Sequence, residues 1–287
     1  MFSRLQLGLV AALVLASCAR PEPASPALWL IEGQGGERAW LFGTIHALPD
    51  PVEWRTAKIE AALDASDQLV LEVAAVDDGA TIGKIFARLG SSPGLASLPM
   101  RLSPEDRSEL QSDMAAVGLA PGALDRLETW AAALALQQAV AAREGIDSSN
   151  GIDRALVRGW NKPVAELEGA ATQLAIFDRL AEDDQRALLL AVLRGGKAGE
   201  EIERLARAWM QGDMALIGKE VEGDFLSDPE LREALLVGRN RAWVVKLEAS
   251  LKQGARPFVA VGAAHLAGPE GLPAMFSAKG YKVTRVQ

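Results

Sequence analysis

Two short segments near opposite ends of this chain share one pattern, and that pattern limits the folds open to it. In each segment a run of apolar residues leads into glycine, two further residues and a histidine, giving Gly43-Thr-Ile-His46 and Gly262-Ala-Ala-His265. These are the only two histidines among the 287 residues. A short apolar run that ends at glycine is typical of a buried β-strand that stops at a tight turn. We therefore expect two equivalent strand ends that form one bipartite site.

Each histidine lies in a unit of strand, loop, helix and strand. In the first unit, strands at residues 39–44 and 68–73 enclose a helix at 54–65, and in the second, strands at 257–261 and 281–286 enclose a helix at 269–279. A run at residues 27–31, joined to the first unit across several glycines, predicts a β-hairpin. The chain is thus predicted to be α/β, with a mixed sheet whose carboxyl edge, the usual ligand site of such sheets, carries both G-x-x-H loops.

The residues between the two units have mostly helical patterns. Periodic segments that start near Ser103, Leu124, Asp183, Glu200 and Pro229 predict helices, and the first has an N-cap serine followed by proline. One short run at residues 163–168 predicts a strand that returns to the main sheet. We therefore expect one α/β domain over residues 28–287, with a helical insertion at about residues 100–252, rather than two separate domains.

The first seventeen residues have the pattern of a signal peptide. Arg4 precedes an apolar stretch that is too short to cross a bilayer by itself. The stretch closes with Leu15-Ala-Ser-Cys18, which resembles the bacterial lipobox and contains the only cysteine of the chain. That resemblance implies cleavage before Cys18, lipid attachment to its sulfur, and a lipidated tether over residues 18–27. The alternative is an ordinary secretory signal that is cut after Ala19.

Either kind of processing exports the protein, so we expect it in the cell envelope. Sorting rules for lipoproteins depend on the residue after the cysteine, and Ala19 favours the outer membrane if the cell has one. The expected partners are the membrane, reached through the lipid at Cys18, and a peptide or small-molecule substrate. The formal net charge of −8 argues against nucleic acid, because phosphate binding needs a basic surface.

The two histidines and one acidic residue suggest a metal centre. Two neutral imidazoles and one carboxylate hold a divalent metal and leave room for a water molecule that the metal activates. His46, His265 and Glu72, which lies in the middle of the predicted strand at 68–73, are the candidates for this set. It suits zinc, manganese, cobalt or ferrous iron. Gly43 and Gly262 would shape the two loops, because glycine allows close backbone approach.

Each of these residues also has a structural alternative. A histidine at the end of a strand often serves only as a hydrogen-bonding group, and Glu72 would be structural if it were paired with Arg239. Arg239 and Asn240 lie on a predicted helix beside its apolar stripe, where such residues usually face solvent. Asp153 and Glu168 are further candidates for the site, and a salt bridge or a helix cap is the alternative for each.

Taken in order, the motifs of this chain resemble the TraB/GumN family, which includes the Tiki metalloproteases. They are Gly43-Thr-Ile-His46, Leu71-Glu72, Gly151-Ile-Asp153, Lys162-Pro-Val together with Leu167-Glu168, Arg239-Asn240-x-x-Trp243 and Val261-Gly-Ala-x-His265. The resemblance implies a lipid-anchored, metal-dependent hydrolase of a peptide or another amide or ester bond. It also implies that Arg239 and Asn240 support the metal ligands or stabilise an oxyanion, with Asp153 and Glu168 in the same class.

Two other functions stay open on the same fold. The broader group is similar to erythromycin-esterase-like hydrolases and to haem-binding ChaN-like lipoproteins, so fold alone does not decide the activity. One alternative is a metal-independent hydrolase in which His46 is the general base. The other is a lipoprotein that binds haem or a captured peptide without turnover.

Overall fold

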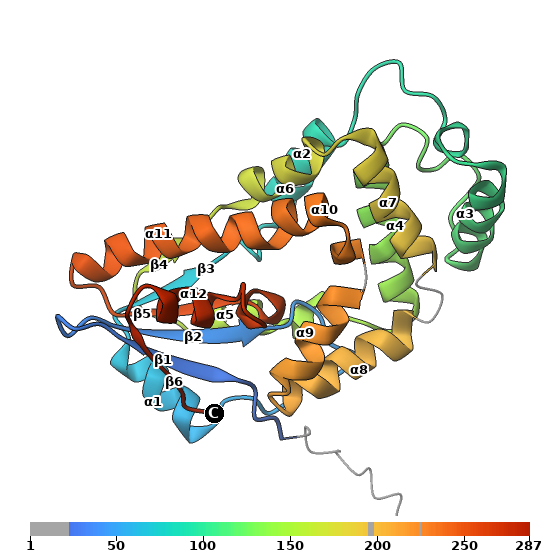
Figure 1. Cartoon of the computed structure of the whole chain (residues 1–287). Coiled ribbons are helices and arrows are strands. Elements are labelled where there is room, and N and C mark those ends of the chain that lie inside the picture. The colour runs from blue at the N-terminus through green and yellow to red at the C-terminus, as the bar shows by residue number, and fades with distance from the viewer. Residues whose placement is uncertain (1–22, 195–197, 224) are drawn as a thin grey trace, which may run out of the picture.

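A six-stranded mixed β-sheet forms the centre of the computed structural model, which describes residues 23–194, 198–223 and 225–287 (Figure 1). The predicted signal peptide and Cys18 lie outside the described residues. The strand order is β4-β3-β5-β2-β1-β6. The strands are β1 (Leu28–Glu32), β2 (Arg38–Thr44), β3 (Gln68–Leu71), β4 (Val164–Glu166), β5 (Pro257–Gly262) and β6 (Lys282–Arg285). The predicted α/β fold with a mixed sheet is therefore confirmed.

The two strands that lead into the G-x-x-H loops are neighbours in this sheet. β2 and β5 run parallel, and Gly43 is paired with Val261 and Thr44 with Gly262. Both loops therefore leave the sheet at the same carboxyl edge. β3 is parallel to β5 on its other side, so the chain that follows β3 also emerges at this edge. β1 and β2 form the predicted antiparallel hairpin.

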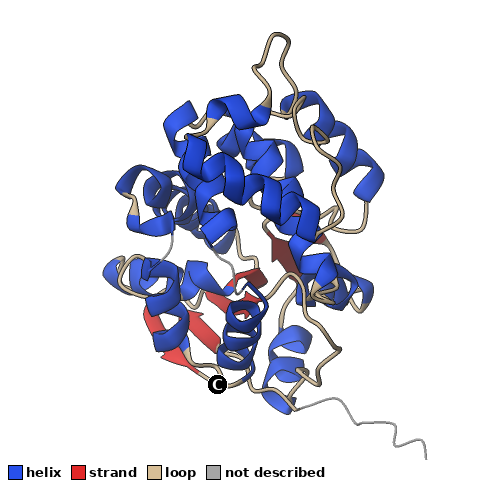
Figure 2. Cartoon of the chain, turned by 90° about the vertical axis from the view of Figure 1, so that its right-hand side faces the viewer, coloured by secondary structure: helices blue, strands red, loops and turns tan. Residues whose placement is uncertain are grey.

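Helices cover both faces of the sheet and form a separate helical region beyond its carboxyl edge (Figures 1 and 2). The α-helices are α1 (Ala57–Ala65), α2 (Gly79–Leu89), α3 (Pro104–Ala116), α4 (Thr129–Arg143), α5 (Ile152–Arg158), α6 (Ala170–Asp178), α7 (Glu182–Arg194), α8 (Ala198–Met210), α9 (Met214–Gly223), α10 (Pro229–Arg232), α11 (Gly238–Lys252) and α12 (Leu272–Ala278). None of the described helices is long and apolar enough to cross a membrane.

The alternation of side chains along the strands produces two cores, one on each face of the sheet. Phe42, Leu71 and Phe258 point into the core that α1, α5 and α8 cover. The residues next to them, Leu41, Val70 and Val259, point into the core that α11 and α12 cover. In Figure 1, α11 lies above the sheet and α1 below it. The strands β2, β3 and β5 are thus buried on both sides, which explains their nearly continuous apolar sequences.

The helical region has a core of its own, built mainly from α3, α4 and α7. Trp130 is fully buried there, with its ring 5.4 Å from that of Phe86 and 6.1 Å from that of Phe177. The region begins with α2, ahead of the predicted boundary near residue 100, and α2 packs against α6. Figure 2 shows these helices together on one side of the strands.

Several predicted element boundaries differ in the structure, and two of them lie beside specific hydrogen bonds. The third strand ends at Leu71, so Glu72 is not within it but is the first residue beyond it. The Glu72 carbonyl accepts the backbone N–H groups of Glu168 and Gly169, which arrive after β4. α4 begins at Thr129 rather than near Leu124, and the Arg101 guanidinium binds the carbonyl oxygens of Asp125 and Leu127 in the preceding turns.

The predicted helix from Pro229 is interrupted by one π-helical segment. α10 and α11 are joined through the π-helix η4 (Glu233–Val237).

At the amino-terminal end, the described part of the predicted tether lies against the domain. The Ala24 N–H donates to the Glu53 carbonyl and the Ser25 N–H to the Met210 carbonyl, and Ala24 belongs to the core beneath the sheet.

Trp209 on α8 ties this helix to the sheet beneath the first G-x-x-H loop. Its indole Nε1 donates to the Gly43 carbonyl at 2.7 Å, and the side chain is buried. We expect Trp209→Phe to lower the free energy of unfolding by about 1–3 kcal/mol, because a buried carbonyl loses its donor. Trp160→Phe is the control, since Trp160 is only half-buried and donates to the Pro163 carbonyl at the surface. Equal losses in urea denaturation followed by circular dichroism would contradict this account.

Candidate active site at the carboxyl edge of the sheet

The three predicted metal ligands border one space at the carboxyl edge of the sheet. His46 lies two residues beyond β2, Glu72 directly follows β3, and His265 lies in the 3-10 turn η5 (Ala263–Leu266) after β5. A Cβ atom on Gly262 would lie 3.3 Å from Glu72 Oε1, 3.4 Å from His46 Nε2 and 3.8 Å from His265 Cδ2. Glycine at this position therefore leaves free the space that the three side chains surround.

The orientation of His46 is set by a carboxylate from α5. His46 Nδ1 lies 2.7 Å from Asp153 Oδ2, and the Thr44 hydroxyl donates to Asp153 Oδ1 at 2.7 Å. The carboxylate accepts the Nδ1 proton, which directs Nε2 toward Gly262. The Asp153 carboxylate also raises the pKa of His46 above its usual value. Because the His46 side chain is 67% exposed, it is the member of the group that solvent reaches most easily.

His265 is held differently, although its loop has the same sequence pattern. The ring is only 5% exposed, its Nδ1 lies 2.7 Å from Asn240 Oδ1, and Trp243 covers it with a centroid separation of 4.4 Å. Burial lowers the pKa of His265, so this imidazole is neutral. A neutral ring that donates from Nδ1 to an amide oxygen has its lone pair on Nε2. That nitrogen lies 3.2 Å from Arg239 Nη1.

The carboxylate of Glu72 is buried, and each of its oxygens has a donor. Oε2 accepts from Gln173 Nε2 at 2.9 Å and from Arg239 Nη2 at 2.6 Å. Oε1 accepts only the Gly262 N–H, at 2.8 Å, and lies 4.0 Å from His265 Nε2. Burial by itself would raise the pKa of Glu72, but the His46 imidazole, whose own pKa is raised, the Arg239 guanidinium and the Gly262 N–H outweigh it and lower the pKa. Glu72 is thus ionised, with acceptor capacity left on Oε1.

Arg239 and Glu168 form an ion pair behind this carboxylate. Arg239 Nε donates to Glu168 Oε1 at 2.9 Å, and Nη2 donates to Glu168 Oε2 at 2.9 Å as well as to Glu72. Trp243 Nε1 donates to Glu168 Oε1 at 2.9 Å, and the guanidinium lies 4.7 Å from the Trp243 ring centroid. Arg239 therefore bridges two buried carboxylates and does not face solvent as an isolated helical arginine would.

Asn240 orients His265 and is itself fully buried. Its Nδ2 donates to the carbonyl oxygens of His265 and Glu270, while its Oδ1 faces the His265 ring. These contacts use both amide protons, so none is left for a substrate oxygen. Gly43 has no polar side chain to offer, and a Cβ there would lie 3.1 Å from Ala263. Both residues thus shape the site from behind.

Two side chains of the site, Thr44 and Gln173, are absent from the sequence-based predictions. The sequence does contain a signal for Thr44, because it is a polar residue that ends an apolar run two positions before His46. In the structure it is the last residue of β2, and its side chain is buried. Gln173 comes from α6, 101 residues after Glu72, and nothing in its helical neighbourhood distinguishes it from a surface glutamine.

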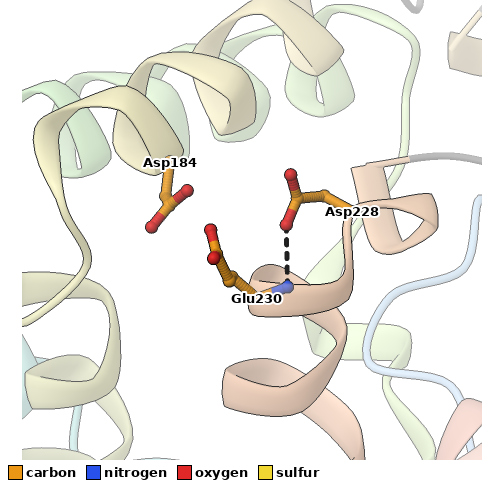
Figure 3. Close-up of side chains that lie close together, drawn as sticks. All are labelled: Asp184, Asp228 and Glu230. Carbon is orange, nitrogen blue, oxygen red and sulfur yellow. Dashed lines mark hydrogen bonds between the residues drawn. The ribbon is translucent and has the colours of Figure 1, made fainter.

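The ligand atoms of His46, Glu72 and His265 border the same space without forming a tight cluster. Among the described residues, the only group of three whose ligand atoms all lie within 4.8 Å of one another is Asp184, Asp228 and Glu230 (Figure 3). Asp228 in that group accepts the backbone N–H of Glu230 and caps α10. The acidic group is therefore explained, at least at Asp228, by helix capping.

Comparisons with known proteins place the chain among bacterial relatives. The sequence model of the TraB/PrgY/gumN family matches residues 27–285. The chain is 28% identical over 244 residues to the uncharacterized protein YbaP of Shigella flexneri and of Escherichia coli K12, covering 84% of this chain and 88% of each relative. It is 24% identical over 266 residues to an uncharacterized protein of Treponema pallidum, covering 85% of this chain and 78% of the relative. No solved structure gives a significant match.

The pKa values of the two histidines should be shifted in opposite directions from the usual imidazole value. We expect NMR titration of the metal-free protein to give a pKa above about 6.5 for His46, which faces Asp153, and below it for buried His265. Asp153→Asn should lower the His46 pKa by about one unit or more, because a charge in contact is removed. Asp64→Asn, at an exposed position on α1, is the control. An unchanged His46 pKa in Asp153→Asn would contradict the assignment.

Proposed function

The chain belongs to the TraB/PrgY/gumN family, and we propose that it acts as a hydrolase of a peptide or another amide or ester bond. The observation that carries this proposal is the convergence of His46 Nε2, Glu72 Oε1 and the His265 ring on the position that a Gly262 Cβ would occupy. An ionised carboxylate and two oriented imidazoles around one open space are the groups that activate water for hydrolysis. The exposure of His46 suits a substrate that extends beyond the site, as a peptide does.

We further propose that His46, Glu72 and His265 hold a divalent metal ion. The donor set of two nitrogens and one oxygen fits such an ion, and both rings have the Nδ1 partner that metal-bound histidines need. Glu72 Oε1 keeps acceptor capacity on the side that faces the imidazoles. When bound, the metal would supply Lewis-acid activation of a water molecule at neutral pH.

The local charge also favours a cation. The carboxylates of Glu72, Asp153 and Glu168 are each less than 10% exposed, and Arg239 is the only lysine or arginine paired with them in the described parts of the chain. With His265 neutral and His46 deprotonated, as a metal ligand must be, three negative charges face one positive charge. Buried charge without compensation is costly, and a divalent ion would balance this excess, whereas protonation of His46 would balance half of it.

The residues of this chain would have distinct tasks in hydrolysis. Asp153 and Asn240 hold the two imidazoles in fixed orientations, and Glu168 holds the guanidinium of Arg239 against Glu72. The Nη1 of Arg239 donates to the Leu235 carbonyl and lies 3.2 Å from His265 Nε2, and its proton that faces the imidazole is the one we assign to a developing oxyanion. Asn240 has no such task, because its amide protons are engaged by backbone carbonyls.

A second candidate is hydrolysis without a metal, with His46 as general base. It is favoured by one contact, the Arg239 Nη1 at 3.2 Å from the His265 nitrogen that a metal would need. In this mechanism the Asp153–His46 pair abstracts a proton from water, and Asp153 stabilises the imidazolium, as the carboxylate does in hydrolase triads. The two candidates differ in what Glu72 does, since only the first makes it a metal ligand.

Metal content is the direct test of the first candidate. Protein purified without a His-tag and incubated with Zn²⁺ or Mn²⁺ should retain stoichiometric metal after gel filtration. The metal content is measured by inductively coupled plasma mass spectrometry. Glu72→Gln should lose it, because the charge that balances the cation is removed. Glu166→Gln should retain it, since Glu166 is an exposed neighbour whose carboxylate accepts only the Ala74 N–H. Equal metal content in both variants would exclude Glu72 as a ligand.

Activity tests then separate the candidates. We expect hydrolysis of a quenched fluorescent peptide pool or of p-nitrophenyl acetate to stop with EDTA and to return with Zn²⁺ or Mn²⁺. His46→Ala should remove nearly all activity, and adding His265→Ala should cost little more, as for residues that act as one unit. Activity that resists EDTA but not His46→Ala would support the metal-free mechanism. A Soret band on haem titration without any hydrolysis would support a binding protein instead.

We also propose that the mature protein is a lipoprotein anchored in the cell envelope through Cys18. The support is the lipobox-like Leu15-Ala-Ser-Cys18 with the only cysteine of the chain. A multi-chain lipid anchor holds a protein firmly, whereas a single acyl chain binds only marginally. Cys18→Ser should therefore move the protein from the membrane fraction to the soluble fraction. A mature amino terminus at Arg20 in the soluble fraction of the unaltered protein would contradict the anchor.

A further inference from the structure

Thr44 is a buried polar side chain at the exit of β2, beside the candidate site. It is 2% exposed and is the last residue of the strand. Its hydroxyl donates to Asp153 Oδ1 at 2.7 Å, and the other oxygen of the same carboxylate receives His46 Nδ1. Thr44 and His46 are two positions apart, and their contacts with one carboxylate place both side chains on the same side of the chain. Together they hold both oxygens of one carboxylate.

The backbone fixes the two ends of this arrangement. The Ile152 N–H at the start of α5 donates to the Ile45 carbonyl, which lies between Thr44 and His46. A Cβ on Gly151 would lie only 2.3 Å from the His46 carbonyl oxygen, so the start of α5 lies directly against the loop. Glycine is required for this approach. Asp153 is therefore brought close to His46 by the main chain, while its side-chain torsions remain to be set.

We propose that Thr44 is a positioning residue that sets the Asp153 carboxylate and, through it, the His46 imidazole. Its hydroxyl donates to Oδ1, which leaves Oδ2 to accept the Nδ1 proton of His46 and directs Nε2 into the space beside Gly262. Its importance for hydrolysis rests on the proposed function. The orientation of the ring does not, because it concerns contacts among residues of this chain alone.

Thr44 lies in an apolar strand where valine would fill the same volume. Valine would leave Asp153 Oδ1, part of a carboxylate whose side chain is 9% exposed, without the donor that the structure gives it. In the described structure Arg154, the next residue, pairs with Asp77 and not with Asp153. The hydroxyl, rather than the shape of the side chain, is thus the property that the site uses.

Two substitutions separate the hydroxyl from the packing. Thr44→Val keeps the shape and removes the donor, whereas Thr44→Ser keeps the donor and removes a methyl group. Long-range proton–nitrogen NMR spectra of the metal-free protein, recorded at one fixed pH above the pKa of His46 so that the ring is neutral, report the ring tautomer, and the two histidines give only two ring systems. We expect Thr44→Val to change the His46 tautomer signals and leave those of His265 unaltered, while Thr44→Ser resembles the unaltered protein.

A second readout measures metal affinity, with Zn²⁺ alone as the probe in a competition titration. Loss of a group that orients a ligand typically weakens metal binding about 10–100-fold, so we expect this loss in Thr44→Val and little loss in Thr44→Ser. Thr56→Val is the matched control, because Thr56 caps α1 and bonds to Gln287, away from Asp153. If Thr44→Val does not fold, Thr44→Ala removes the same hydroxyl.

The outcomes decide the proposal independently of the reaction. Unchanged His46 ring signals in Thr44→Val would overturn the positioning role, and equal changes in the serine and valine variants would assign Thr44 to packing. If Zn²⁺ does not bind to the unaltered protein, the metal-dependent mechanism fails. The NMR comparison still shows whether Thr44 orients the ring.

Discussion

The buried guanidinium of Arg239 is the interaction on which the arrangement of the site depends. It joins Glu72, which follows β3, to Glu168, which follows β4. Arg239 itself comes from α11, which covers one face of the sheet. Replacement of one partner in such a buried pair typically costs about 3–5 kcal/mol, because an uncompensated charge remains. The network thus fixes where β3 and β4 end relative to α11. Glu72 then presents Oε1, and not Oε2, to the two histidines.

The two G-x-x-H loops are alike in sequence and different in chemistry. His46 is exposed and paired with the Asp153 carboxylate, while His265 is buried and paired with the Asn240 amide. A carboxylate partner favours the charged imidazole and an amide does not, and burial opposes the charge further at His265. One loop therefore supplies a ring that exchanges protons readily, and the other supplies a neutral nitrogen. The two loops resemble each other in sequence and in their position at the ends of parallel neighbouring strands.

The sequence predicts the sheet edge better than it predicts the partners of the site. Strand periodicity and the repeated glycine–histidine spacing suffice to bring β2 and β5 together, because parallel neighbours with equal registers must end at the same edge. The predicted strand extends to Val73, whose side chain suits a strand, whereas in the structure β3 ends at Leu71, where main-chain contacts of Glu72 with residues 168 and 169 replace the ladder. Local propensity does not contain that tertiary contact.

The partners of the histidines come from the helical segments and lie far away in the sequence. Asp153 is 107 residues from His46, and Gln173 is 101 residues from Glu72. Apolar patterns show that α5 and α6 are helices, but they do not show which polar residue of each helix faces the sheet edge.

This separation has a structural consequence. The sheet by itself provides His46, Glu72 and His265, whereas Asp153, Glu168, Gln173 and Arg239 arrive only when the segments between β3 and β5 have folded against it. Without them, the Glu72 carboxylate would keep only one of its present hydrogen-bond donors, the backbone N–H of Gly262. Both imidazoles would also lose groups that fix their rings. Formation of the site is therefore coupled to docking of α5, α6 and α11, which makes these helices part of the site and not only a cover over it.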